Sequence, residues 1–463
     1  MSLIKSVSGV RGIVRSDDPR AMTLTGDVVR RLGRAYATYL RRSAGARDAM
    51  RLVGGRDGRA GGEVLLTNFA EGARASGVHV VDLGIVTTPG IAMMVRATGA
   101  AGGVVITASH NPDEWNGVKL MTPDGHAPTK GASDAIFDVF DRGDFANDDA
   151  AVSDEPVSID PHEYHVAAVL ATVDVKRIRR RTFKVVLDSV NGAGTAAGRM
   201  LLERLGCRVV HLNDQPAPRF AHMPEPTREN LVGLCACVAR EGADVGFAQD
   251  PDADRVAIID ERGTYIGEEY SLALAAKRVF QTNPGPAAAN LSTSRLIDDI
   301  AAAAGGPCRV YRSAVGEANV VEVMHANGCV IGGEGNGGVI DPRVVHVRDS
   351  LAGMALCLDL LAAEGDPLSR VTSALPSYAI VKSKIECDQA RIPAALAAVR
   401  EAFADGSIND VDGVRVDWPA DRAWAHVRAS NTEPIMRLIV EAPEACAAEK
   451  IAMRVRCAIR DYL

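Results

Sequence analysis

Three aspartates alternate with other residues in the short segment DPDADR, at positions 250, 252 and 254. The apolar runs 245–248 and 256–260 flank this segment and predict two strands. In an extended loop, side chains at i, i+2 and i+4 point the same way, so we expect Asp250, Asp252 and Asp254 to converge. Carboxylates at such short range repel one another unless a cation lies between them. A small set of ligands that are all oxygen atoms suits Mg²⁺.

Two other interpretations of this loop are open. An EF-hand also begins with alternating aspartates, and Glu261 falls at the position of its last ligand. However, Arg255 stands where that loop needs glycine, and strands flank the segment where helices should. A solvated acidic turn is the remaining alternative. The pattern favours a catalytic metal loop.

A second candidate site is the hexapeptide TASHNP at residues 107–112, which follows the apolar strand predicted at 103–106. A serine in the turn after a parallel strand lies at the carboxyl edge of the sheet, where α/β proteins bind ligands. Ser109 could accept a phosphoryl group there, and His110 could steady its oxygens. An ordinary polar turn is the alternative. Ser–His–Asp hydrolase chemistry fits poorly, because Ser109 does not lie in G-x-S-x-G.

A third candidate is the glycine-rich segment GGEGNGG at residues 332–338. Its glycines allow close backbone approach to a ligand. Glu334 offers hydrogen-bond acceptors and Asn336 offers both donors and acceptors, which suits sugar hydroxyls. A flexible turn is the alternative.

A fourth candidate is the segment RASNTEP, which begins at Arg428 and is followed by Arg437. Two guanidinium groups and a run of hydroxyl, amide and backbone donors form a plausible phosphate cradle. An ordinary turn between two strands is the alternative.

Two smaller features join these motifs: Arg11 lies on a glycine-flanked loop, and Lys119 follows Ser109 closely in NGVK. Either cation could reach a phosphate or help move a proton, although such side chains are often simply solvated.

The elements that must position these motifs follow one order: an apolar strand, a turn rich in Gly, Asp or Ser, and a helix rich in Ala and Leu. This order begins at the strands 50–54, 183–187 and 287–291, which predicts an α/β fold with a repeated domain. From about residue 376, short strands instead alternate with a helix near 392–404, which predicts a small α+β domain.

Composition changes give the expected domain limits. An acidic stretch of little periodicity at 144–160 predicts a linker, and further changes come near residue 262 and at 366–376. We therefore predict four domains, with the serine loop, the metal loop, the sugar loop and the phosphate segment in turn, at residues 1–155, 156–262, 263–372 and 373–463. A ligand site where domains meet is common, and each motif falls in a different domain.

The bulk properties exclude several classes of protein. The net charge of −7 argues against nucleic-acid binding, which usually needs a basic face. Nine scattered cysteines without a CxxC pair indicate reduced thiols and a cytoplasmic protein. No uncharged apolar run approaches the roughly 20 residues that span a bilayer. The longest candidate, 351–361, contains Asp359 and predicts a core helix, so we expect no membrane partner.

The sequence resembles the α-D-phosphohexomutase family, which includes phosphoglucomutase, phosphomannomutase and phosphoglucosamine mutase. The resemblance rests on five motifs in this order along the chain: TASHNP, NGVK, DPDADR, GEGNGG and RASNTEP. The resemblance implies three related α/β domains and a smaller C-terminal α+β domain of the TBP-like kind around a central cleft. It also implies a hexose phosphate substrate and a monomer or homodimer.

The resemblance implies roles for the candidate residues. Ser109 would carry a phosphoryl group, with Mg²⁺ between that group and Asp250, Asp252 and Asp254. The hexose would pass through a bisphosphate, which also activates the enzyme. Charge and proton handling would fall to Arg11, His110, Lys119 and Arg255. Glu334 and Asn336 would hold ring hydroxyls, and the substrate phosphate would be held by Arg428, Ser430, Asn431, Thr432 and Arg437.

Departures from the bacterial phosphomannomutase/phosphoglucomutase pattern bear on the sugar. Asn336 and Gly338 stand where that subgroup has Ser and His, and Glu317 stands where it has His. The sequence is thus more similar to phosphoglucosamine mutases of the archaeal-like type, with a phosphomannomutase/phosphoglucomutase as the alternative. A metal-dependent phosphatase would want a second metal or a water-activating group. A non-catalytic sensor should have lost Ser109 or a metal carboxylate.

Overall fold

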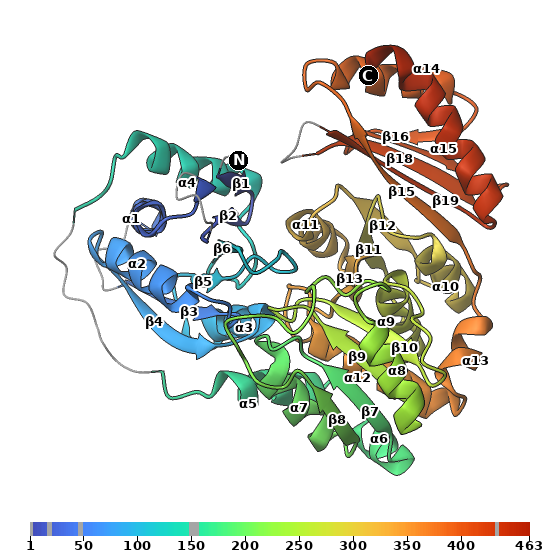
Figure 1. Ribbon diagram of the computed structural model, residues 1–463, viewed down its shortest axis with the longest axis horizontal. Coiled ribbons are helices and arrows are strands. Elements are labelled where there is room, and N and C mark those ends of the chain that lie inside the picture. Colours follow the sequence, from blue (N-terminus) through green and yellow to red (C-terminus); the bar gives the residue numbers. More distant parts are fainter. Residues whose placement is uncertain (1–2, 16–20, 45–49, 148–156, 431–434) are drawn as a thin grey trace.

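The computed structural model describes residues 3–15, 21–44, 50–147, 157–430 and 435–463 of the 463-residue chain (Figure 1). Four separate sheets run along it, each with its own helices. The first is a six-stranded sheet in the order β1-β2-β6-β5-β3-β4. Its elements are β1 Ile4–Ser6, β2 Gly9–Ile13, α1 Gly26–Ala44, β3 Met50–Arg56, α2 Gly62–Arg74, β4 Val78–Ile85, α3 Thr88–Thr98, β5 Gly103–Ile106, β6 Trp115–Met121 and α4 Lys130–Arg142.

The second sheet has the order β10-β9-β7-β8 and the third has the order β12-β11-β13-β14. The second group consists of α5 Pro161–Leu170, α6 Val175–Arg181, β7 Lys184–Asp188, α7 Gly194–Arg204, β8 Arg208–Leu212, α8 Val232–Glu241, β9 Val245–Gln249 and β10 Val256–Asp260. The third consists of α9 Glu269–Thr282, β11 Ala287–Asn290, α10 Leu296–Ala304, β12 Val310–Ser313, α11 Glu317–Asn327, β13 Ile331–Glu334, β14 Gly338–Ile340, α12 Ser350–Glu364 and α13 Leu368–Ser373.

The last sheet is antiparallel throughout, in the order β15-β19-β18-β17-β16, and α14 and α15 pack side by side against it. Its elements are β15 Ala379–Glu386, α14 Ile392–Ala402, β16 Ser407–Asn409, β17 Val414–Trp418, β18 Ala423–Ala429, β19 Ile435–Ala442 and α15 Ala445–Ile459. This confirms the predicted fold class of three related α/β units and a smaller C-terminal α+β unit. The expected linker at 144–160 lies largely outside the described residues, at 148–156.

One four-strand pattern recurs in the first three sheets. In β4-β3-β5-β6, in β8-β7-β9-β10 and in β12-β11-β13-β14, the first three strands are parallel and the fourth is antiparallel to the third. Each four-strand pattern therefore ends in a hairpin, and we call the connections at 107–114, 250–255 and 335–337 the hairpin loops. These loops hold the serine, the aspartates and the Asn336 segment. The repeat thus places three sequence motifs at equivalent points of three sheets.

The strands that lead into the hairpin loops are buried on both faces. In β5, Val104 and Ile106 pack into one core while Val105 packs into another, because alternate side chains point to opposite faces. The second core also contains α12 and parts of all three α/β units. Such double burial explains why these strands read as continuous apolar runs in the sequence.

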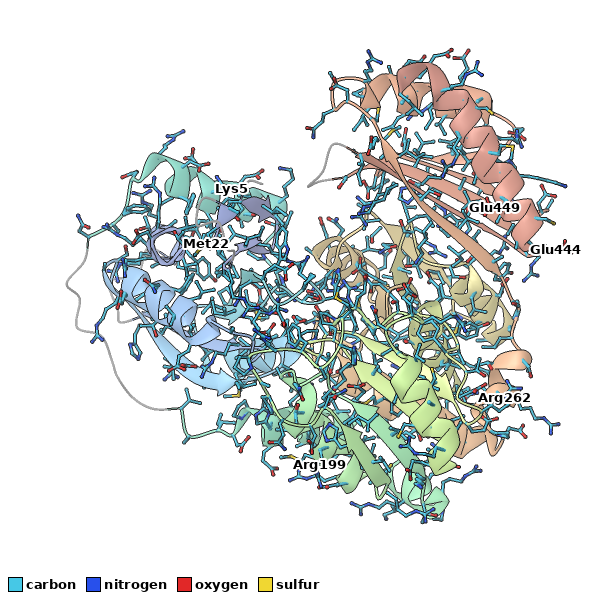
Figure 2. The ribbon with its side chains drawn as sticks, in the orientation of Figure 1. Lys5, Met22, Arg199, Arg262, Glu444 and Glu449 are labelled. Carbon is cyan, nitrogen blue, oxygen red and sulfur yellow. The ribbon has the colours of Figure 1, made fainter. Side chains whose placement is uncertain are left out.

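Helix α12 confirms the core helix predicted at 351–361, since all its residues from 350 to 361 are buried. Its Asp359 accepts hydrogen bonds from Arg177 Nη2 of α6 at 2.9 Å and from Arg278 Nε of α9 at 2.7 Å. Other charged side chains, including Arg199 and Glu449, lie at the periphery (Figure 2). Among the described residues, we find no helix with the length and apolarity needed to cross a bilayer.

We expect Asp359→Ala to lower the free energy of unfolding by about 3–5 kcal/mol, because it leaves buried arginine charge without its partner. Urea unfolding of both proteins measures the loss. Asp366→Ala is the matched control, since its ion pair with Arg370 is largely exposed and should contribute about 0–1 kcal/mol. Equal losses in the two variants would show that Asp359 is not a structural anchor.

Candidate active site

The three hairpin loops form one connected site. Ser109 Oγ donates a hydrogen bond to Asp250 Oδ2 at 2.9 Å, which joins the first loop to the second. Arg348 bridges Asp254 and Glu334, which joins the second loop to the strand that enters the third. The serine, metal and sugar motifs predicted from the sequence therefore lie together.

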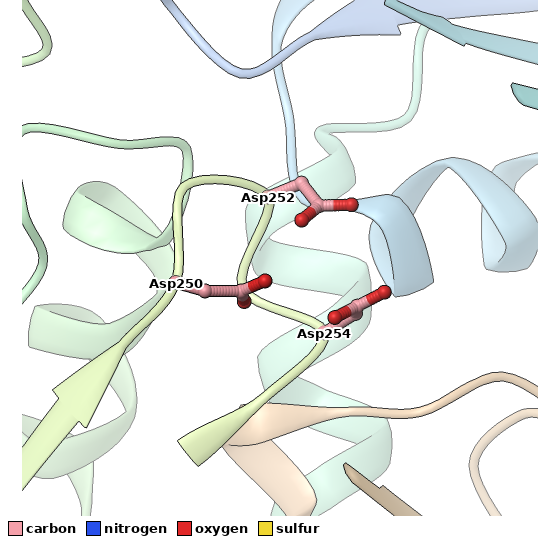
Figure 3. A group of neighbouring side chains, drawn as sticks. All are labelled: Asp250, Asp252 and Asp254. Atoms are coloured by element: carbon pink, nitrogen blue, oxygen red, sulfur yellow. The ribbon is translucent and has the colours of Figure 1, made fainter. Parts of the chain in front are cut away.

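The three aspartates converge as expected, with ligand oxygens all within 4.8 Å of one another (Figure 3). The reason given for this convergence was wrong, because the loop is not extended. It turns tightly, with Ala253 in the left-handed region at φ 56° and its N–H bonded to the carbonyl of Asp250 at 2.9 Å. The turn folds the chain back so that Asp250 and Asp254 face the same point as Asp252.

The charges of this triad are strongly unequal. Burial and the neighbouring carboxylates of Asp254 and Asp252 raise the pKa of Asp250 well above its usual range. Burial also works to raise the pKa of Asp254, but Arg348 and then Lys119 outweigh it and hold that pKa well below the usual range. The site therefore depends on cations for its ionisation.

Two carboxylate oxygens of the triad without hydrogen-bond partners among the residues that the structure describes indicate that the triad can bind a divalent cation. Within the described part of the chain, Asp252 Oδ1 and Asp254 Oδ1 are buried and have no hydrogen-bond partner. Buried polar atoms are rarely left without a partner unless a ligand supplies one. Carboxylate oxygens of this kind are the ligands that Mg²⁺ prefers.

Ser109 is held in a strained conformation by Arg59 and Asp57, which were not predicted as site residues. Its φ of 51° lies in the left-handed region, which non-glycine residues seldom adopt. Arg59 Nη2 donates to the Ser109 carbonyl at 2.5 Å, and Arg59 Nη1 donates to the carbonyl of Trp115 at 2.8 Å. Asp57 balances the fully buried guanidinium at 2.8 Å and also accepts from Thr107 Oγ1. The Asp-Gly-Arg turn after β3 was the available signal.

Lys119 lies within the metal loop's carboxylates. Its Nζ is 2.6 Å from Asp252 Oδ2 and 3.0 Å from Asp254 Oδ2. Burial works to lower the pKa of Lys119, but these two carboxylates raise it above its usual value. The lysine is therefore a fixed positive charge beside the triad. Thr88 Oγ1 donates to the same Asp252 oxygen at 2.5 Å.

The other residues predicted to handle charge and protons lie close to the serine loop and the metal loop. His110 Nδ1 is 3.3 Å from Ser109 Oγ, and Arg11 Nη1 donates to Asn111 Oδ1 at 3.2 Å. Arg255 Nε lies 3.8 Å from Asp254 Oδ1. The charge of Arg255, then burial and the charge of Arg11, lower the pKa of His110 to about 2. His110 is thus a neutral imidazole in a ring of positive charge.

The sugar motif is preorganised around Glu334. Its Oε1 accepts hydrogen bonds from Asn290 Nδ2 at 2.7 Å and from the Gly316 N–H at 3.1 Å. Its Oε2 accepts from Arg348 Nη1 at 2.5 Å and from Asn336 Nδ2 at 3.4 Å. Burial works to raise the pKa of Glu334, but Arg348 and the Asn290 hydrogen bond lower it. Glu334 is therefore an ionised acceptor held in one orientation.

Arg348 was not identified from the sequence. It follows β14 and is largely buried, with side-chain exposure of 10%. Besides Asp254 at 2.7 Å, it pairs through Nε with Glu317 Oε2 at 3.2 Å. A lone arginine before a buried helix gives no signal in one sequence, because its partners come from distant segments.

Glu269 supports the sugar loop from behind and was also missed. A Cβ placed on Gly335 would lie 2.0 Å from Glu269 Oε2, so the buried carboxyl group would have to shift to admit a larger residue. Glu269 Oε2 accepts from the Ser294 N–H at 3.0 Å, while its Oε1 is buried without a partner among the described residues. Burial raises the pKa of Glu269 to about 8.

The fourth motif lies on the C-terminal unit. The register of β18 and β19 pairs Arg428 with Arg437, so the two predicted phosphate-binding arginines stand side by side. Ser430 is buried at the end of β18, whereas Asn431 and Thr432 lie outside the described residues. This unit docks on the third α/β unit, for example through His426 Nδ1 and Ser292 Oγ at 2.9 Å.

Four matches to known protein families cover nearly the whole chain. Residues 3–147, 163–263 and 268–378 match phosphoglucomutase/phosphomannomutase alpha/beta/alpha domains I, II and III, and residues 381–458 match the C-terminal domain of the same family.

Relatives that carry two different enzyme names are similar to this chain over most of its length. A phosphoglucomutase/phosphomannomutase of Thermococcus kodakarensis is 38% identical, with 94% of this chain and 93% of the relative covered. A probable phosphoglucosamine mutase of Methanopyrus kandleri is 37% identical with the same coverage. A crystal structure of a phosphoglucomutase/phosphomannomutase family protein from Burkholderia thailandensis superposes with a TM-score of 0.85 at 27% identity, with 98% and 97% covered.

The raised pKa of Glu269 predicts a pH-dependent stability. The folded protein holds this proton up to about pH 8, whereas the unfolded chain releases it near pH 4.5, so its contribution is lost as the pH rises between these values. Glu269→Gln should match the wild type at pH 5 and be more stable by a few kcal/mol at pH 9. Thermal unfolding at both pH values measures this, and an equal difference at both would contradict it.

Proposed function

Because the chain belongs to the phosphoglucomutase/phosphomannomutase family of phosphohexomutases, we propose that it interconverts glucosamine 6-phosphate and glucosamine 1-phosphate. The observation that carries the chemistry is Ser109 Oγ at 2.9 Å from the buried aspartate triad. The preference for glucosamine is supported by relatives named phosphoglucosamine mutase and by Glu317, a mostly buried carboxylate beside the sugar loop. A carboxylate there can accept from an ammonium group.

The first half-reaction starts from a phosphoryl group on Ser109. The bond between phosphorus and Ser109 Oγ breaks as a hydroxyl oxygen of the bound hexose phosphate forms its own bond to phosphorus. The hexose hydroxyl loses a proton and the departing Ser109 Oγ gains one, so the products are a hexose bisphosphate and an unmodified serine. Arg11, His110, Lys119 and Arg255 surround this point and would handle charge and proton. Phosphoryl transfer needs such positioning and charge balance more than covalent chemistry.

We infer that Asp250, Asp252, Asp254 and the group on Ser109 hold Mg²⁺, since the triad leaves two buried oxygens without partners. When bound, Mg²⁺ neutralises charge on the transferring phosphoryl group and its carboxylate surroundings. The chain's own contribution is the fixed turn at Ala253 and the clamp of Arg59 on the serine loop.

The second half-reaction needs the bisphosphate to turn over, so that its other phosphoryl group returns to Ser109. Glu334 and Asn336 would hold ring hydroxyls in both orientations. The phosphate distant from Ser109 would bind the segment that includes Arg428, Ser430, Asn431, Thr432 and Arg437. Because this segment belongs to a separate unit, its movement can release and recapture the sugar without disturbing the metal loop.

A phosphomannomutase/phosphoglucomutase is the second candidate, and the Thermococcus relative at 38% identity favours it. Both functions would use the same residues and pass through a bisphosphate of their own hexose, which would also serve as activator. All nine cysteines are free thiols, which supports a place in the reducing cytoplasm.

We expect Ser109→Ala to abolish turnover, because it removes the oxygen that carries the phosphoryl group. Isotopically labelled hexose bisphosphate should label the wild type at Ser109 and leave the variant unlabelled. Ser43→Ala, on the exposed face of α1, is the matched control and should label normally. Turnover near the wild-type rate in Ser109→Ala would exclude the phosphoserine mechanism. Release of inorganic phosphate by the wild type, in place of the isomerised sugar phosphate, would indicate a phosphatase.

The preferred sugar can be identified by comparing kcat/KM values of the Mg²⁺-loaded, bisphosphate-activated enzyme. The substrates to compare are glucosamine 6-phosphate, glucose 1-phosphate and mannose 1-phosphate. We expect the amino sugar to be preferred by about tenfold or more, the discrimination given by about 1.4 kcal/mol of differential transition-state binding. Glu317→Gln should reduce that preference, since it removes the negative charge. A preference for glucose or mannose would assign the chain to the second candidate function.

A further inference from the structure

We propose that Arg348 couples the binding of Mg²⁺ to the binding of the sugar phosphate, so that each strengthens the other. This inference rests on the proposed function, because it assumes that Asp254 is a metal ligand and that Glu334 binds the sugar. Arg348 lies outside all the sequence motifs and is held between two of them.

Arg348 spans the two sites with different nitrogens of one guanidinium group. Nη2 donates to Asp254 Oδ2 at 2.7 Å in the metal loop, while Nη1 donates to Glu334 Oε2 at 2.5 Å in the sugar motif. Nε faces Glu317 Oε2 at 3.2 Å, and the Arg348 N–H donates to that same oxygen at 3.0 Å. The planar fork of arginine makes this double bridge possible, whereas one ammonium would not reproduce it.

The glycine that ends the sugar loop supports the same arrangement. A Cβ placed on Gly338 would lie 2.2 Å from Cδ and 2.9 Å from Cγ of Arg348. The arginine's aliphatic chain therefore occupies the space that a side chain at 338 would need. The glycine in GEGNGG and the bridging arginine thus depend on each other, which gives this departure from the bacterial sugar loop a physical reason.

The hydrogen bonds of Arg348 engage oxygens of Asp254 and Glu334 that the two ligands would need. Mg²⁺ binding at Asp254 would oppose the neighbouring guanidinium charge and weaken the Arg348–Asp254 contact. The freed end of Arg348 can then turn to an incoming phosphate dianion, which arginine binds well. That movement in turn releases Glu334 Oε2 for a sugar hydroxyl.

The sign of the coupling follows from this sequence of contacts. A sugar phosphate that draws Arg348 away from Asp254 removes a cation that competes with Mg²⁺, so it tightens Mg²⁺ binding. By linkage, Mg²⁺ tightens the binding of the sugar phosphate by the same factor. Couplings between two sites in proteins are typically about 5- to 150-fold, so we expect an effect of at least about fivefold.

The test is calorimetric titration of Mg²⁺ into the full chain lacking phosphate on Ser109, a form that cannot turn over. Titrations are run with and without saturating glucosamine 6-phosphate. In the wild type, the sugar phosphate should lower the Kd of Mg²⁺ at least about fivefold. In Arg348→Lys, which keeps the charge but not the double bridge, the ratio of the two Kd values should fall towards one.

Two further variants make the result specific. Gly338→Ala should also reduce the ratio, because it displaces Arg348 without removing any charge. Arg370→Gln removes an exposed positive charge elsewhere, with 75% side-chain exposure, and should keep the wild-type ratio. Thermal unfolding verifies that each variant is folded.

The outcomes separate this inference from the proposed function. A wild type that does not bind Mg²⁺ at all would remove the metal site and with it the proposed function. A wild type that binds Mg²⁺ with a ratio near one overturns only the coupling, whether or not the variants fold. A full wild-type ratio in folded Arg348→Lys likewise shows that Arg348 does not carry it.

Discussion

The rest of the site depends on three carboxylates that are buried next to one another. Asp250, Asp252 and Asp254 have no more than 1% exposure, and their oxygens lie within 4.8 Å of one another. Water cannot screen charges at this depth, so their repulsion must be balanced by fixed cations or relieved by protonation. Lys119 and Arg348 provide the balance at Asp254, which stays ionised, and Asp250 shows the cost where that balance is weaker.

The fold meets this requirement by repeating one hairpin. Each α/β unit turns its last strand back antiparallel, and the loop so formed emerges from strands buried on both faces. The buried strands fix the positions of both ends of each loop. Ser109 can therefore be held in a strained conformation and Ala253 in a tight turn. Three loops at equivalent positions then carry three different sets of side chains, namely the serine, the aspartates and the Asn336 segment.

The sequence predicted those parts that depend on local pattern. The strands at 103–106 and 256–260 and the helix at 351–361 could be found because double burial gives continuous apolar runs, and the motifs stand next to them. The Asp-Gly-Arg turn after β3 was a local signal for Arg59, whereas Arg348 and Glu269 could not be found this way. Their partners lie up to 94 residues away, and a buried arginine reads in one sequence like an exposed one. The domain limits and the catalytic roles remain predictions of the sequence.

The C-terminal unit differs from the others in how it is attached, and this bears on the reaction. The three α/β units share one apolar core that includes α12, whereas the C-terminal unit has a core of its own. It meets the third unit through polar contacts such as His426 with Ser292 and the Arg295 N–H with Glu441. Polar contacts exchange for water at little net cost, so such an interface can open without exposing a core. The reaction we propose, in which a bisphosphate turns over while the metal loop stays fixed, would use this division: the shared core holds the charged loops, and the unit with its own core carries the arginines proposed to bind the distant phosphate.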